Sequence, residues 1–77
     1  MPDDFTLWVR DCERLGLELW PIEMRGNHGV YMTKKPYWSG NRLFYTTPMY
    51  HVWIRGKCVL TTSNYREAVR RWENGAI

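Results

Sequence analysis

The first apolar residues of the chain recur with the period of a helix. Five of them, spaced at i, i+3, i+4, i+7 and i+10, form one stripe: Phe5, Trp8, Val9, Cys12 and Leu15. Asp3 and Asp4 precede this stripe, where acidic side chains cap free backbone N–H groups. Gly16 follows it, where the left-handed end of a helix favours glycine. The pattern predicts an amphipathic helix over residues 4–15.

A second helical stripe near the end of the chain consists of Tyr65, Ala68, Val69 and Trp72. Asn64 precedes this stripe and Glu67 follows three residues later, which is the layout of a capping box. Asn74 and Gly75 supply the stop signal. We expect a helix that opens after Asn64 and ends at Asn74-Gly75.

Between the helices, residues that favour strands alternate with turn signals. The predicted strands are residues 17–24, 30–35, 43–47, 49–54 and 58–61. Pro21 lacks the N–H of a central strand, so the first strand is an edge strand or is bent. We expect a turn at Gly26-Asn27-His28-Gly29 and a loop over residues 37–41 after Pro36. Pro48 either separates the third and fourth strands or interrupts a single one.

Arg55-Gly56-Lys57 predicts a tight hairpin whose register decides which side chains enter the core. With a three-residue loop, the core face carries Val52, Ile54, Cys58 and Leu60. With a two-residue loop, Trp53 joins Cys58 and Leu60 instead. We predict the first register because it gathers the aliphatic side chains, and the second remains the alternative.

These elements predict one α+β domain over residues 1–77 in the order α-β-β-β-β-α, counting residues 43–54 as one strand interrupted at Pro48, with one strand fewer as the alternative. In the simplest packing, both helices cover one face of an antiparallel sheet of three to four strands, giving two layers. The other face of the sheet would then be open and would carry the surplus aromatic residues.

Charge is distributed unevenly along the chain. Up to residue 23, six acids and two arginines give a net charge of −4. Residues 24–66 contain seven basic residues, no acid and eight of the twelve aromatic rings, so this stretch carries +7. Such asymmetry points to an anionic partner or to an interaction tail. The many rings argue against a solvated tail.

The two cysteines and the start of the chain bear on the cellular compartment. Cys12 and Cys58 lie far apart, among apolar neighbours, so we expect two buried, reduced thiols, with a single disulfide as the alternative. The first residues, MPDDFTLW, contain neither a basic region nor a long apolar run. We therefore expect a soluble, cytoplasmic protein.

The sequence contains no recognisable catalytic or metal-binding motif. Its N-terminal carboxylates lie on the solvent side of a predicted helix or in an edge strand, its His and Cys residues lack zinc-site spacing, and no glycine-rich phosphate loop follows a strand. We therefore expect a protein that is not an enzyme and needs neither metal nor cofactor. The alternative is a small metal-free ribonuclease-type toxin built from His28, His51 and Arg42.

The basic and aromatic residues together predict a partner-binding surface. It comprises Lys34, Lys35, Tyr37, Trp38, Arg42, Tyr45, Trp53, Arg55 and Lys57. Tyr, Trp and Arg are the typical hot-spot residues of protein interfaces. The same set is suited to nucleic acid, because rings stack on bases and cations neutralise phosphates. Alternatively, Tyr37 and Trp38 fold back to cover a small core.

Two families show a loose similarity to parts of this layout. The order α-β-β-β-α and Gly26-Asn27-His28 are similar to the double-stranded-RNA-binding domain, but Ser63-Asn64-Tyr65-Arg66 lacks that family's lysine cluster. A strand, a tight turn and a closing helix resemble the arm-binding domains of phage integrases, without a shared motif. We assign no family. In kind, a short, aromatic-rich chain is similar to accessory proteins of phages and mobile elements, some of which, including anti-CRISPR proteins, occupy the surface of a host protein.

We therefore expect a small non-enzymatic binding protein that blocks or modulates a larger partner through its open sheet face and residues 34–42. The partner would be a host protein or a protein–nucleic-acid complex. Direct binding of DNA or RNA by the same surface is the alternative. An open aromatic face is also typical of a homodimer interface.

Overall fold

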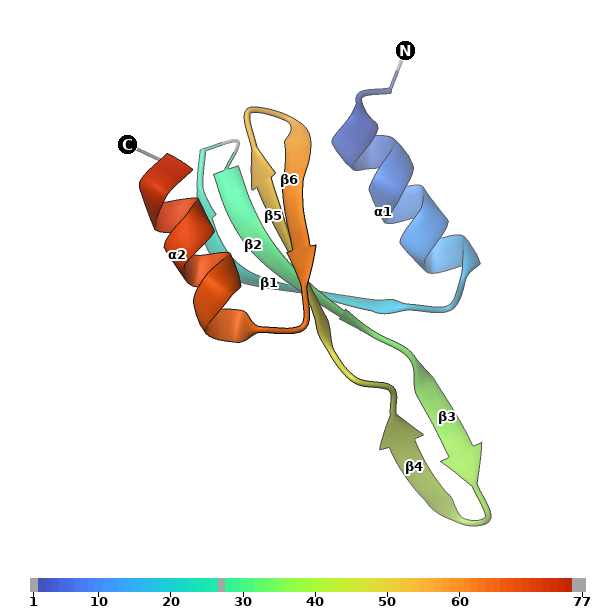
Figure 1. Ribbon diagram of the computed structural model, residues 1–77. Helices are drawn as coiled ribbons and strands as arrows, with labels where there is room; N and C mark the ends of the chain where they lie inside the picture. Colours follow the sequence, from blue (N-terminus) through green and yellow to red (C-terminus); the bar gives the residue numbers. More distant parts are fainter. Residues whose placement is uncertain (1, 27, 76–77) are drawn as a thin grey trace.

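The computed structural model describes residues 2–26 and 28–75, which form two helices and six strands (Figure 1). In chain order the elements are α1 (Asp4–Arg14), β1 (Glu18–Arg25), β2 (His28–Lys34), β3 (Pro36–Ser39), β4 (Arg42–Tyr45), β5 (Met49–Ile54), β6 (Lys57–Thr62) and α2 (Tyr65–Gly75). The predicted α+β class is confirmed. Asn27, part of a predicted turn, lies outside the described residues.

Both helices begin at the residues that the sequence indicates. The Asp3 carboxylate accepts the N–H of Thr6 at 2.8 Å, which caps the start of α1. Gly16 follows α1 in the left-handed conformation, with φ of 74°. The side-chain oxygen of Asn64 accepts the N–H of Glu67 at 3.1 Å, so the predicted cap of α2 is also present.

Four strands form one antiparallel sheet in the order β1-β2-β5-β6, and β3 pairs with β4 in a separate two-stranded hairpin. β1 lies at an edge, and its register shifts between Pro21 and Glu23. Such an irregularity at an edge is where a proline without an N–H is tolerated. The central strands β2 and β5 contain Val30 and Val52, which are paired and fully buried.

The segment predicted as a loop over residues 37–41 instead completes β3 and its turn. Ser39 pairs with Arg42 across the two-residue turn Gly40-Asn41. Gly40 has φ of 62°, as the first central position of a type II′ turn requires. Gly40 and Asn41 form a turn as predicted, and β4 overlaps the strand predicted over residues 43–47, whereas β3 was predicted as part of a loop.

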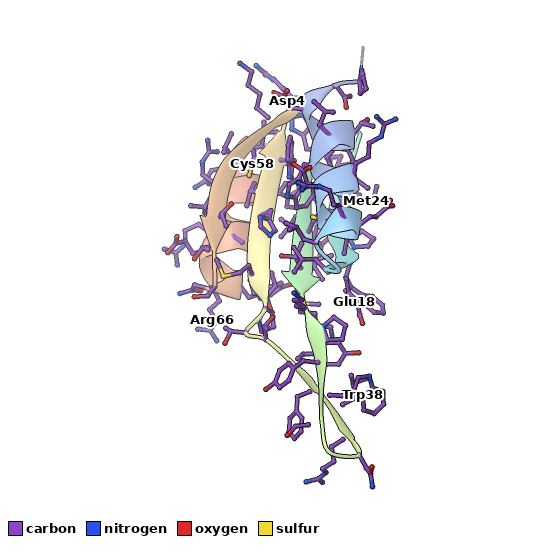
Figure 2. All side chains as sticks on the ribbon, turned by 90° about the vertical axis from the view of Figure 1, so that its right-hand side faces the viewer. Asp4, Glu18, Met24, Trp38, Cys58 and Arg66 are labelled. Carbon is purple, nitrogen blue, oxygen red and sulfur yellow. The ribbon has the colours of Figure 1, made fainter. Side chains whose placement is uncertain are left out.

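The two helices lie on opposite faces of the four-stranded sheet rather than on one face (Figures 1 and 2). Val30 and Val52 pack against Ala68 and Trp72 of α2. Neighbouring residues of a strand point to opposite faces. The adjacent residues of β2 and β5 accordingly face α1, where the rings in contact are Phe5, Trp8, Tyr31, His51 and Trp53. The predicted open aromatic face is therefore covered by α1.

The β5–β6 hairpin combines the two registers considered from the sequence. Arg55 and Gly56, with φ of 53° and 79°, form a two-residue turn of the I′ kind. The register then pairs Ile54 with Lys57, Trp53 with Cys58 and, after a shift, Val52 with Leu60. The shift leaves Val59 as an extra residue in β6, as in a β-bulge. Leu60 thereby packs on the α2 side of the sheet. Cys58 is exposed, so the prediction that it lies in the core is wrong.

The β3–β4 hairpin projects past both helices at one end of the sheet (Figure 1). The molecule is elongated as a result, with principal extents of 46, 33 and 15 Å. The opposite end of the sheet holds the β5–β6 turn and the start of α1 (Figure 1).

Candidate functional site

The β3–β4 hairpin, here called the arm (residues 36–45), carries apolar side chains on both of its faces. Directly opposite residues of an antiparallel pair share a face. The pairing places Pro36, Trp38, Leu43 and Tyr45 on one face and Tyr37 and Phe44 on the other. The rings of Tyr37 and Phe44 are stacked, with centroids 5.7 Å apart.

These side chains are largely in contact with solvent. Trp38 is 70% exposed, and Tyr37, Leu43, Phe44 and Tyr45 are each 40–49% exposed. A two-stranded hairpin is only marginally stable alone in water, and contiguous exposed apolar surface marks interaction sites. The arm is therefore the candidate binding site of this chain.

Hydrogen bonds close the base of the arm. The N–H of Lys35 donates to Thr46 Oγ1 at 2.9 Å, and the N–H of Thr46 donates to the Lys35 carbonyl at 3.0 Å. Two paired bonds between the strands where they leave the sheet fix the direction in which the arm starts.

Lys34 reinforces the base by lying against two aromatic rings. Its Nζ is 3.9 Å from the ring centroid of Tyr45 and 5.7 Å from that of Trp20. The Trp20 indole N–H donates to Glu18 at 3.1 Å. Partial desolvation and the Glu18 carboxylate raise the pKa of Tyr45. The ammonium group of Lys34 thus takes part in contacts within the chain that orient the arm.

The nine residues predicted to bind a partner fall into two groups. Those at the arm and its base are Lys34, Lys35, Tyr37, Trp38, Arg42 and Tyr45. The other three, Trp53, Arg55 and Lys57, lie at the opposite end of the sheet, where β5 turns into β6. Figure 2 shows this separation, with Trp38 on the arm and Cys58, the register partner of Trp53, far from it.

Trp53 is a core residue. It is 5% exposed, and its ring lies 5.2 Å from that of Trp8 and 5.3 Å from that of Phe5. Because α1 covers Trp53, its position does not fit the predicted contact with a partner. Arg55 and Lys57 are exposed, but they do not adjoin the arm.

The sequence reasoning missed two exposed large apolar residues of the arm, Leu43 and Phe44. They complete the arm's two faces by pairing with Trp38 and Tyr37. A signal for them is present: two short apolar runs, residues 36–38 and 43–45, flank the turn symmetrically, which is the pattern of a β-hairpin.

The residues of the ribonuclease alternative are not brought together. His28 lies on the face of β2 that carries Val30, His51 lies on the opposite face of the sheet, and Arg42 is on the arm. His51 instead hydrogen-bonds with Thr33 Oγ1 at 2.8 Å and Thr61 Oγ1 at 3.3 Å. Burial lowers the pKa of His51, which favours a neutral structural imidazole.

Other chemistry in the described part of the chain is sparse. Both cysteines are free thiols; Cys12 is buried as predicted, and burial raises its pKa. Within residues 2–26 and 28–75, no three His, Cys, Asp or Glu side chains converge as metal ligands. Neither described helix is long and apolar enough to cross a membrane.

Comparison with protein-family models, with curated proteins and with solved structures gave no match. The function of the arm must therefore be inferred from its own geometry.

Proposed function

We propose that this protein is a non-enzymatic binding protein that blocks or modulates a larger protein by inserting its arm into a cleft of that partner. The observation that carries this proposal is the exposure of apolar side chains on both faces of the arm. A flat partner would cover one face and leave the other in water. A cleft covers both faces, so its walls would be apolar and separated by about the thickness of one hairpin with its side chains.

The charges of the arm indicate what borders that cleft. Lys35 at the base and Arg42 beside the turn are exposed cations, and residues 35–46 contain no acid. Complementary charge steers association and selects partners more than it strengthens binding. We therefore expect an acidic rim around an apolar cleft. A cleft of this kind can belong to a host protein or to a protein–nucleic-acid complex. The chain itself would then act as an anti-CRISPR-type accessory protein of a phage or mobile element.

The shape of the arm favours a second candidate function, the binding of nucleic acid. The major groove of DNA admits a two-stranded β-ribbon, and exposed rings can stack on unpaired bases. Phosphate contacts dominate the affinity of such proteins and require several cations. The arm offers six apolar side chains but only two adjoining exposed cations, Lys35 and Arg42, so we place this function second.

The test is affinity capture from host lysate, identification of the captured protein, and calorimetry with that purified protein. Trp38→Ala should raise the dissociation constant about 30-fold or more, because removal of a buried aromatic hot spot costs about 2 kcal/mol or more. Leu43→Ala and Leu7→Ala form a matched pair, since the two leucines are 44% and 46% exposed and only Leu43 lies on the arm. Leu43→Ala should weaken binding and Leu7→Ala should not.

The competing function gives a different pattern. If DNA or RNA is the ligand, Arg42→Ala should lower the slope of log affinity against log salt by about one, and Arg10→Ala on α1 should not. If affinity depends steeply on salt and Trp38→Ala has little effect, the protein-binding proposal is wrong and nucleic-acid binding takes its place. Equal effects of Leu7→Ala and Leu43→Ala would exclude the arm as the contact.

A further inference from the structure

A cavity of about 250 Å³ lies at the end of the sheet opposite the arm, between the start of α1 and the turns that contain Gly26 and Gly56. Its described side chains are those of Asp3, Phe5, Met24, Tyr31 and Trp53. The lining is thus three aromatic rings, one thioether and one carboxylate. None of its side chains belongs to the arm.

The three rings form a continuous aromatic wall. The Phe5 ring lies 5.1 Å from that of Tyr31 and 5.3 Å from that of Trp53, measured between centroids. The indole nitrogen of Trp53 is enclosed, and it has no hydrogen-bond partner in the described chain. An enclosed nitrogen does not face the cavity, so Trp53 presents carbon to it.

Gly29 allows Tyr31 to take its place in this wall. A Cβ atom at Gly29 would lie 2.7 Å from Cε2 of the Tyr31 ring, closer than real contacts allow. Gly29 is also the register partner of Trp53, so the absent side chain leaves room between the two rings. The aromatic wall therefore depends on a glycine near the start of the central strand β2.

The charges around the cavity are mixed, because Asp3 lines it whereas the exposed cations Arg55 and Lys57 flank the lining residue Gly56. Asp3 is the charged side chain among its described lining residues. The hydrogen bonds that its carboxylate accepts from Thr6 lower the pKa of Asp3, so the group is ionised at neutral pH. Arg25, next to Gly26, is directed away, since its guanidinium lies 5.4 Å from the Trp72 ring of α2 on the other face of the sheet.

We propose that this cavity binds a small alkylammonium group, such as the trimethylammonium head of choline. The faces of aromatic rings attract cations, the methyl groups of such a cation pack against rings, and a carboxylate supplies the opposite charge. The volume is below the roughly 300 Å³ at which sites for drug-sized ligands begin, so a head group fits better than a larger ligand. This site lies apart from the arm and does not depend on the proposed function.

The test is an NMR titration of the full chain with choline and, separately, with 3,3-dimethylbutan-1-ol. The second compound has the same shape but carries an uncharged tert-butyl group. Choline should shift the methyl signal of Met24 and the ring signals of Phe5 and Tyr31, and leave those of Tyr37 and Phe44 on the arm unchanged. The neutral compound should bind at least about fivefold more weakly, because only the cation gains from the rings and the carboxylate.

Asp3→Asn and Asp4→Asn provide matched variants for the charge. Asn at position 3 still accepts the N–H of Thr6, so the cap of α1 is kept while the charge is lost. Asp4→Asn removes the same charge one residue later, outside the lining. Asp3→Asn should weaken choline binding about threefold or more, and Asp4→Asn should change it much less.

Gly29→Ala changes the aromatic wall and should abolish the choline-induced shifts of the Tyr31 and Met24 signals. Asp3→Asn decides the outcome if Gly29→Ala does not fold. Equal binding of the charged and neutral compounds, equal effects of the two Asp variants, or choline shifts outside the lining would each overturn the proposal.

Discussion

Trp53 shows how the role of one residue depends on what covers it. The basic residues Arg55 and Lys57 follow it closely in the sequence, and it lies in a strand next to a tight turn, but α1 covers its ring. Trp53→Ala should lower the free energy of unfolding by about 3–5 kcal/mol, as for other buried Trp truncations. Trp20, which is 50% exposed, is the matched control, and Trp20→Ala should cost about 1 kcal/mol or less. Urea unfolding followed by circular dichroism measures both.

The free energy of unfolding of such a domain is about 5–15 kcal/mol, so the Trp53→Ala variant should be measurably less stable than the wild type at room temperature. If the Trp53 variant instead unfolded like the wild type and failed only to bind its partner, our assignment of this residue to the core would be wrong.

His51 should make the stability depend on pH. Burial under Trp8, whose ring lies 4.9 Å away, lowers the pKa of His51 from its ordinary value of 6.5. Between the lowered and the ordinary pKa, the unfolded chain binds more protons than the folded one. The contribution of neutral His51 is therefore present above pH 6.5 and is lost as the pH falls through 6.5 toward the folded pKa.

The measurement is urea unfolding at several values between about pH 7 and pH 5. The wild type should lose stability toward the acid end of this range, and His51→Gln should show a flatter profile. The same slope in both proteins would assign the pH dependence to another group.

At the scale of elements, the arm is separable from the domain that carries it. The buried cluster contains residues of β2, β5 and α2 and none of the arm. Lys35 and Thr46 are already joined by two hydrogen bonds, so the ten residues of the arm can be replaced by an Asn-Gly turn. The shortened chain should keep its free energy of unfolding within about 1 kcal/mol, because no core contact is removed.

Light scattering should show less self-association of the shortened chain, since five exposed apolar side chains are gone. Urea unfolding of the same protein checks the fold. A shortened chain that is unfolded would mean that the arm stabilises the sheet through contacts at its base, such as that of Lys34 with Tyr45.

The β5–β6 hairpin shows why each of the two registers considered from the sequence describes only part of the observed pairing. The predicted three-residue loop gathers the aliphatic side chains and places Val52 opposite Leu60, and the alternative two-residue loop places Trp53 opposite Cys58. A bulge at Val59 satisfies both, because one extra residue in β6 changes the register between the turn and the core. Local sequence signals do not reveal such an insertion, since it depends on which side chains two separate helices cover.

At the scale of the whole molecule, the helices and most strands were predictable because their caps and turns are local. The capping by Asp3 and Asn64 and the left-handed Gly16 involve residues within a few positions of one another. The arrangement of layers was predicted wrongly, because the helices lie on opposite faces of the sheet. A signal for it lies in residues 30–32 and 52–54, which are apolar at every position, because uninterrupted apolar runs are typical of strands buried on both faces.

The composition of the candidate binding site followed from the sequence, but its shape did not. Tyr37, Trp38 and Arg42 lie on the arm as part of the exposed basic and aromatic set, whereas Trp53 does not. Whether a ring in a β-rich segment points into a core or into solvent depends on contacts distant in sequence. Such contacts follow from the fold and not from residue type.

The exposed arm also has a consequence for the life of the protein in a cell. Chaperones and proteases act on chains that expose apolar segments, and a free molecule of this protein presents one permanently. On the proposed function, insertion into the partner hides the arm and removes that signal. The amount of this protein in a cell should then follow the amount of its partner, so that surplus copies are cleared without a dedicated regulator.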